Sequence, residues 1–84
     1  MKAIRTTYHG PGNVRGSRIS ATDEDGNRVT MPYDHSVSSE DNHDAAAVAL
    51  CQKMGWRGVL VSGSIKGGQV YVWLDDSALV QVTR

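Results

Sequence analysis

The stretch SVSSEDNHDAAAVALCQKMGW, residues 36–56, decides the fold because the hydrophobic period changes within it. Ser38 followed by Asp41 resembles a capping box with the shorter acid, and Lys53 stands in the last turn, where it matches the helix dipole. Gly55 suits the left-handed residue that ends a helix. Apolar side chains recur at helical spacing at Ala47, Leu50, Cys51 and Met54. The pattern predicts one helix with one buried stripe.

The segments on either side of this helix have the period-two alternation of strands. Three strands are expected before it, at about residues 2–8, 17–22 and 28–33. The turn DEDGN joins the second to the third, since Asp-Gly supplies the positive φ of a tight hairpin. Two strands are expected after the helix, at about residues 59–65 and 69–74, joined by a Lys-Gly-Gly turn.

This order of elements indicates an α+β fold. It reads β-β-β-α-β-β, with ALVQVT (residues 78–83) as a possible sixth strand. We expect an antiparallel β-sheet with one helix packed on one face, formed by residues 1–84 as a single domain. One sheet face is then left without a helix, and that uncovered face is where we look for a binding site.

Composition narrows the classes of function. Nine basic residues balance nine acidic ones, so the chain lacks the diffuse positive charge of a non-specific nucleic-acid binder. Its single cysteine, Cys51, excludes an internal disulfide and fits a reducing cytosol. The N-terminal residues have no apolar signal region, and no apolar run approaches a membrane span. We expect a cytoplasmic protein without a membrane segment, as a monomer or a homodimer.

Several motifs suggest catalysis or ligand binding but lack the required spacing. GPGNVRGSR (residues 10–18) has no Lys-Ser/Thr ending and precedes a strand, so we expect Gly10 to Gly16 to be an exposed, mobile loop that binds no nucleotide. Its Arg15 should matter less than Arg18, which lies inside a strand. DEDGN has arginine where a calcium loop needs glycine, and the three histidines, His9, His35 and His43, lack zinc spacing. We therefore expect no metal, no cofactor and no enzymatic activity, with Cys51 as a buried, inert thiol.

The uncovered sheet face is the leading candidate site. Strand alternation places three arginines on it, Arg5, Arg18 and Arg28. If Val70, Val72 and Leu74 face the helix, Tyr71 and Trp73 join the arginines, and the face can stack bases and neutralise phosphates. In the opposite register these two aromatics belong to the core and the valines face outward. The first register predicts a module that binds nucleic acid or a host nucleoprotein.

A second candidate site is the acidic start of the helix. Four acids occur within eleven residues with no basic residue among them: Asp34, Glu40, Asp41 and Asp44. They are consistent with helix capping and a solvated helix end. As a functional surface, they would engage a nucleic-acid-binding protein by imitating phosphate groups. This alternative predicts a protein-directed inhibitor or regulator of a host factor.

With NVRGSRISATDEDGN and AAAVALCQKMGW, the chain resembles small uncharacterised proteins encoded by bacteriophages, prophages and plasmids of proteobacteria. The resemblance extends over most of the chain. It implies a cytoplasmic protein of a bacterial host, expressed from a mobile element. Small proteins of that origin often act by binding, as anti-CRISPR and other host-takeover factors do, but the group brings no activity or site residue to this chain.

Overall fold

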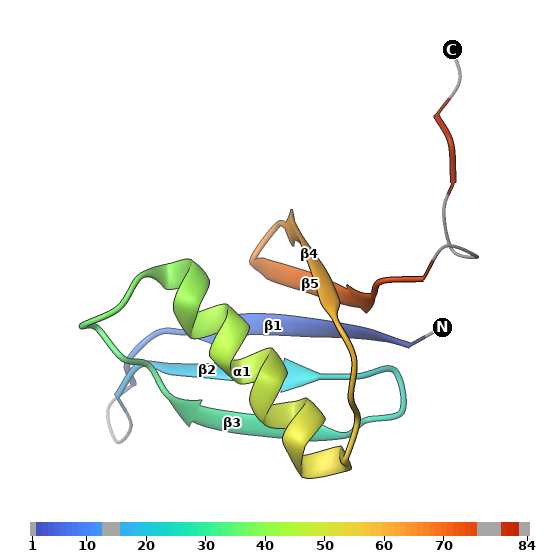
Figure 1. Ribbon diagram of the computed structural model, residues 1–84. Coiled ribbons are helices and arrows are strands. Elements are labelled where there is room, and N and C mark those ends of the chain that lie inside the picture. Colours follow the sequence, from blue (N-terminus) through green and yellow to red (C-terminus); the bar gives the residue numbers. More distant parts are fainter. Residues whose placement is uncertain (1, 13–15, 76–79, 83–84) are drawn as a thin grey trace.

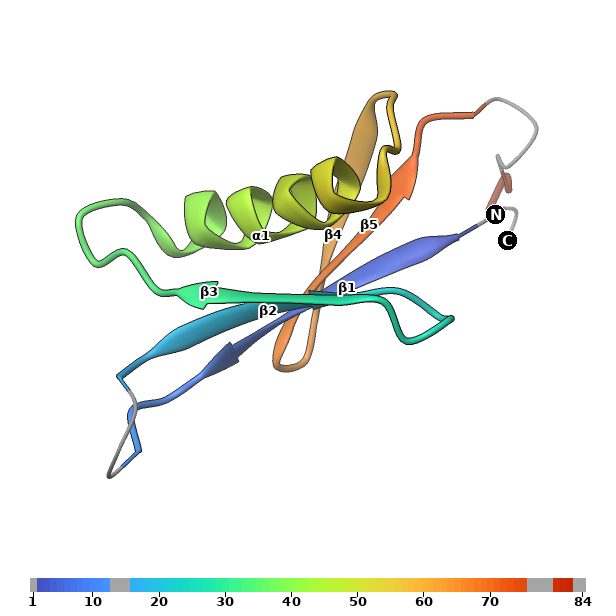
Figure 2. The same ribbon diagram turned by 90° about the horizontal axis from the view of Figure 1, so that it is seen from below.

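The computed structural model describes residues 2–12, 16–75 and 80–82. Within these residues the chain forms five strands and one helix: β1 Ala3–His9, β2 Arg18–Thr22, β3 Arg28–Pro32, α1 Ser39–Met54, β4 Leu60–Ile65 and β5 Gly68–Trp73. The strands make one antiparallel sheet in the order β3-β2-β1-β5-β4. The helix lies across one face, and no described element covers the other (Figures 1 and 2). The predicted α+β fold is confirmed.

The helix begins and ends where its capping residues predict. The side chain of Ser38 accepts a hydrogen bond from the backbone N–H of Asp41 at 3.0 Å, which satisfies one of the free donors of the first turn. Gly55 ends the helix in the left-handed conformation, with φ 74°, and the backbone N–H of Trp56 donates to the Cys51 carbonyl oxygen at 2.9 Å. These caps fix the direction in which the chain enters and leaves the sheet.

Carboxylates of the DEDGN turn accept hydrogen bonds and form an ion pair within the protein. Asp23 Oδ1 accepts hydrogen bonds from the backbone N–H groups of Asp25 and Asn27, and Asp23 Oδ2 accepts one from the Asn27 side chain at 2.8 Å. The Asn27 bonds hold the pKa of Asp23 below its ordinary value. Lys2 forms an ion pair with Asp25 at 2.5 Å. The carboxylates of Asp23 and Asp25 therefore stabilise the hairpin turn itself. The described residues contain no cluster suited to a metal ion.

The core lies between the helix and the covered face of the sheet. Its buried apolar members are Ile4, Ile19, Ala21, Ala46, Ala47, Leu50, Cys51 and Tyr71. The predicted stripe of Ala47, Leu50 and Cys51 is buried, and Met54 packs against it partly buried. Small alanines let the helix approach β1 and β2 closely, which explains why it covers the β1–β3 half of the sheet more fully than β4 (Figure 1). The β4–β5 hairpin thus stands partly free of the helix.

The possible sixth strand is not seen. Residues 80–82 have no strand conformation, and residues 76–79 and 83–84 lie outside the described residues. The loop around Arg15 also lies outside them, because residues 13–15 are not described.

Candidate nucleic-acid interface

Antiparallel register arranges the uncovered face of β1, β2 and β3 in three rows of side chains. The first row is Arg5, Thr22 and Arg28, the second is Thr7, Ser20 and Thr30, and the third is His9, Arg18 and Pro32. The three predicted arginines therefore share one face of the sheet, opposite the helix. Between them lie the hydroxyl groups of Thr7, Thr22 and Thr30, and such groups also bind phosphate oxygens, whereas Ser20 is buried.

Hydrogen bonds orient two of the three arginines. The Arg28 guanidinium donates from Nε to Thr30 Oγ1 at 3.3 Å, and its Nη2 lies 3.4 Å from His9 Nε2. His9 Nε2 also lies 2.9 Å from Ser20 Oγ. Arg28 thus lies along the face toward the third row. This partial ordering lowers the conformational entropy that the side chain would lose on binding an anion.

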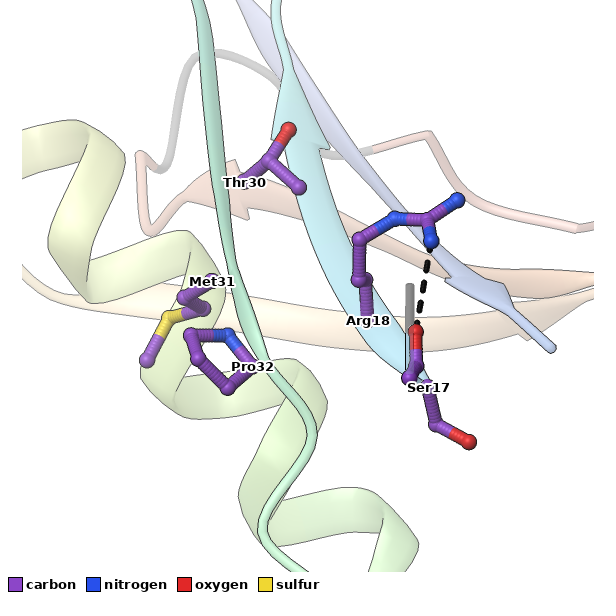
Figure 3. A pocket seen from close by; sticks show the side chains of 6 residues that line it. Ser17, Arg18, Thr30, Met31 and Pro32 are labelled. Atoms are coloured by element: carbon purple, nitrogen blue, oxygen red, sulfur yellow. Dashed lines mark hydrogen bonds between the residues drawn. The ribbon is translucent and has the colours of Figure 1, made fainter. Parts of the chain in front are cut away.

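Arg18 borders a shallow hollow at the β3 edge of the sheet. The hollow has a volume of about 360 Å³ and is lined by Gly16, Ser17, Arg18, Thr30, Met31 and Pro32. Arg18 Nη1 donates to the Gly16 carbonyl oxygen at 3.2 Å, as the dashed line in Figure 3 marks. Figure 3 also shows Met31 on the helix side of β3, whereas Arg18 and Thr30 extend to the other side. The carbonyl contact leaves the remaining N–H groups of Arg18 available.

No described carboxylate forms an ion pair with an arginine of this face. Among the described residues the ion pairs are those of Lys2 with Asp23 and Asp25, and none involves Arg5, Arg18 or Arg28. A guanidinium group without a carboxylate partner retains its affinity for phosphate and carboxylate oxygens. Although the net charge is zero, the face of β1–β3 is locally basic.

The β5–β4 half of the same face carries aliphatic side chains in place of the expected aromatic ones. Register places Val70 beside Arg5, and Val72 beside Ala3 and Val61. Val61 is 46% exposed. The uncovered face therefore combines a basic, hydroxyl-rich half with a half of small branched side chains.

The expectation that Tyr71 and Trp73 join the arginines is wrong, and the alternative register holds. Tyr71 pairs with Ile4, a fully buried core residue, so its side chain faces the helix and is only 4% exposed. Trp73 lies on the same side, where its Nε1 donates to the Arg57 carbonyl oxygen at 3.0 Å. A large aromatic buries more apolar area than valine, so the pairing that puts the rings in the core is favoured.

A hydrogen bond anchors Tyr71 under the helix. Its hydroxyl donates to Asp44 Oδ1 at 2.5 Å. Burial, together with this bond, raises the pKa of Tyr71 well above its ordinary value. Trp73 packs edge-on against Trp56, with ring centroids 5.6 Å apart. All three tyrosines and both tryptophans of the chain thus belong to the helix side of the sheet or to the loops beside it, and the arginine face has no large ring for stacking bases.

Two of the four acids at the helix start have structural roles. Asp44 accepts the Tyr71 hydrogen bond, and Asp34 accepts from the side chain and the backbone N–H of Ser36. These Ser36 bonds hold the pKa of Asp34 below its ordinary value. Glu40 and Asp41 are exposed in the first helical turn. All four acids are exposed at the start of the helix, and Asp34 and Asp44 have structural hydrogen bonds in addition.

Cys51 lies in the core as expected, and burial raises the pKa of its thiol. A protonated, buried thiol is a poor nucleophile.

Comparisons of the chain with protein-family models, with curated proteins and with solved structures found no match. The resemblance to proteins of phages and plasmids therefore stays a prediction. Among the described residues no helix has the length and apolar character needed to cross a membrane.

Proposed function

We propose that the protein is a non-enzymatic binding module that contacts the phosphate backbone of a nucleic acid through Arg5, Arg18 and Arg28. The observation that carries this proposal is the presence of three arginines on one uncovered sheet face, none of them in an ion pair with a described carboxylate. Charge-assisted bonds to phosphate are the interactions that such a face provides.

The spread of the arginines favours an extended anion over a small one. Arg5 and Arg28 stand on the first and third of three adjacent strands, so their backbones are about 10 Å apart. Arg18 lies on the strand between them, two rows away. A polymer with several phosphates can offer a separate phosphate to each of these positions.

Without aromatic rings on this face, the expected mode of binding differs from base stacking. Backbone contacts position a protein on a nucleic acid but carry no sequence information directly. We therefore expect weak sequence preference and a strong dependence on salt. Tryptophan emission should change little on binding, because Trp73 faces away from the arginines.

The test is a fluorescence-anisotropy titration of labelled duplex DNA, single-stranded DNA and RNA at about 50 mM and about 200 mM salt. If all three arginines contact phosphates of duplex DNA, the logarithm of the binding constant should fall against the logarithm of salt concentration with a slope of about −3. Each single replacement by alanine should reduce that slope by about 1.

The matched control is Arg57→Ala, which removes the same charge from the loop after the helix. Only the backbone carbonyl of Arg57 has a described hydrogen bond, so the variant should fold normally. Absence of binding at low salt would exclude the proposal, as would an equal loss of affinity for Arg57→Ala and the three face variants.

A further inference from the structure

A second cleft opens on the helix side of the sheet, away from the arginine face. It has a volume of about 760 Å³ and lies between the start of α1, the end of β1 and the β4–β5 hairpin. Its lining is Tyr8, Tyr33, His35, Ser39, His43, Ser64, Ile65, Gly67, Gly68 and Gln69. The size is within the range of small-molecule sites in proteins.

A buried histidine lines this cleft and has one nitrogen without a partner. His43 is 6% exposed, and its Nδ1 lies 2.6 Å from Thr6 Oγ1. No described group bonds Nε2, and that atom is not sealed from solvent, since no fully buried side-chain nitrogen or oxygen of the described residues lacks a partner. His43 lines the cleft, and we infer that Nε2 is the ring atom that faces it. Thr6 fixes the ring, which leaves Nε2 to bond a ligand.

Aromatic side chains form one wall of the cleft. Tyr8 and Tyr33 meet edge to face with centroids 5.0 Å apart, and Tyr33 meets His35 at 5.0 Å. The hydroxyl of Tyr8 is held at 3.0 Å from Ser17 Oγ, yet the residue is 43% exposed. Such rings offer flat surfaces on which a planar ligand can stack.

The remaining lining groups are polar but carry no formal charge. None of the described residues that line the cleft is lysine, arginine, aspartate or glutamate. The Gln69 side chain offers both a donor and an acceptor, and Ser39 and Ser64 offer hydroxyl groups. Burial lowers the pKa of His43, so its imidazole is neutral near pH 7. The cleft thus suits an uncharged, planar ring with hydrogen-bonding edges and not a phosphate.

We propose that this cleft binds a nucleobase, with the ring stacked against Tyr33 and an edge hydrogen-bonded to His43 Nε2 and Gln69. The base can belong to a free nucleoside or to an unpaired position of a nucleic acid, because both present the same ring and edge. This site is on the opposite side of the sheet from Arg5, Arg18 and Arg28 and does not rest on the function proposed for them.

The experiment is an NMR titration of the labelled protein with adenosine, guanosine, cytidine and uridine, with ribose as the ligand that lacks a base. At least one nucleoside should give saturable shifts at Tyr33, Gln69 and the His43 imidazole, and ribose should give none. Shifts produced equally by ribose would overturn the proposal in favour of a sugar site, and no saturable shift with any nucleoside would exclude the site altogether.

Two exposed serines of β4 provide a matched pair of variants. Ser64→Phe fills the cleft and should weaken nucleoside binding at least about tenfold. Ser62→Phe adds the same ring two residues away, where Ser62 lines a separate groove with Asp44 and Tyr71, and should leave binding unchanged. Equal losses in both variants would contradict the assignment of the cleft.

The two sources of the base are separated by repeating the titration with a short oligonucleotide and its abasic counterpart. If the polymer is the source, Ser64→Phe and the abasic substitution should each weaken oligonucleotide binding. If only free nucleosides occupy the cleft, neither change should affect the oligonucleotide. Nucleoside binding should persist when Arg5, Arg18 and Arg28 are all replaced by alanine, so a failure of the arginine face is distinguishable from a failure of this site.

Discussion

Replacing Tyr71 with phenylalanine removes one hydroxyl from the junction between β5 and α1. That hydroxyl donates to Asp44 Oδ1 at 2.5 Å, and the tyrosine ring beneath it is 4% exposed. The phenylalanine ring fills the same space, so the substitution tests the hydrogen bond separately from the packing. We expect the variant to fold with lower stability.

The size of the loss follows from the environment of the bond. A hydrogen bond to a charged group contributes about 1.5 to 3 kcal/mol, and the exposure of Asp44 places this one near the lower end. A loss of about 1.5 kcal/mol lowers the Tm of a domain of this size by about 6 to 12 °C. Tyr33→Phe is the control, since no hydrogen bond of its hydroxyl is described, and it should change stability by less than about 0.5 kcal/mol.

Urea denaturation of Tyr71→Phe, Asp44→Ala and the double variant isolates the interaction as a thermodynamic cycle. The coupling energy should be about 1 kcal/mol or more. The reasoning is refuted if Tyr71→Phe costs as much in the Asp44→Ala background as in the native chain.

Alkaline pH gives a second measurement of the same site. The pKa of Tyr71 is raised in the folded state, so the unfolded chain releases this proton first. The stability that Tyr71 contributes is therefore complete below its ordinary pKa of about 10 and is lost as pH rises above it. Above pH 10, the free energy of unfolding of Tyr71→Phe should decrease less steeply with pH than that of the native chain.

Two further predictions concern residues that line the cleft, His43 and Gly68. Because burial lowers the pKa of His43 in the folded state, the unfolded chain binds a proton there first as pH falls. The free energy of unfolding should therefore decrease as pH drops below about 6.5. Thermal melts at neutral and mildly acidic pH will check this, and an unchanged Tm would contradict it. A β-carbon at Gly68 would overlap the Thr6 carbonyl oxygen, so Gly68→Ala should lower stability by more than about 2 kcal/mol in urea denaturation, whereas Gly63→Ala, with no atom near the added carbon, should not.

The helix and the first hairpin could be predicted from sequence because their signals are local. The Ser38 cap, the Gly55 terminus and the Asp-Gly turn each act within a few residues, and all three appear where expected. The arginines could be placed on one face because Ile19 and Ala21 are the only apolar residues of their strand and so fix which side is buried.

The orientation of β5 could not be predicted with the same certainty. Val70, Tyr71, Val72 and Trp73 are apolar on both faces, so alternation is present but does not say which face is inside. The choice depends on pairing with β1, where Tyr71 meets Ile4, and on an acceptor, Asp44, from the helix. Both partners are distant in sequence. Burial preference of the aromatics was the available signal, and it indicates the observed register.

The proximity of the residues that line the cleft could not be predicted from the sequence either. Tyr8, Tyr33, His43 and Gln69 come from four separate segments, and their proximity depends on where the helix crosses the sheet and on the register of β5. The sequence indicates that Tyr8 shares a strand face with Ile4 and Thr6, but it gives no crossing angle for the helix and does not fix the face of Gln69.

The central position of β1 has a consequence for how the chain reaches this structure. β1 pairs with β2 through a short connection, but its other edge is completed by β5, so that Ala3 pairs with Val72. During synthesis the β1–β2–β3 meander can form early, while the second edge of β1 stays unpaired until β5 has been made. Pairings between such distant segments slow folding, and an open strand edge in the meantime is a template for association with other chains. The risk of misassembly is thus greatest in the interval before the last strand joins the first.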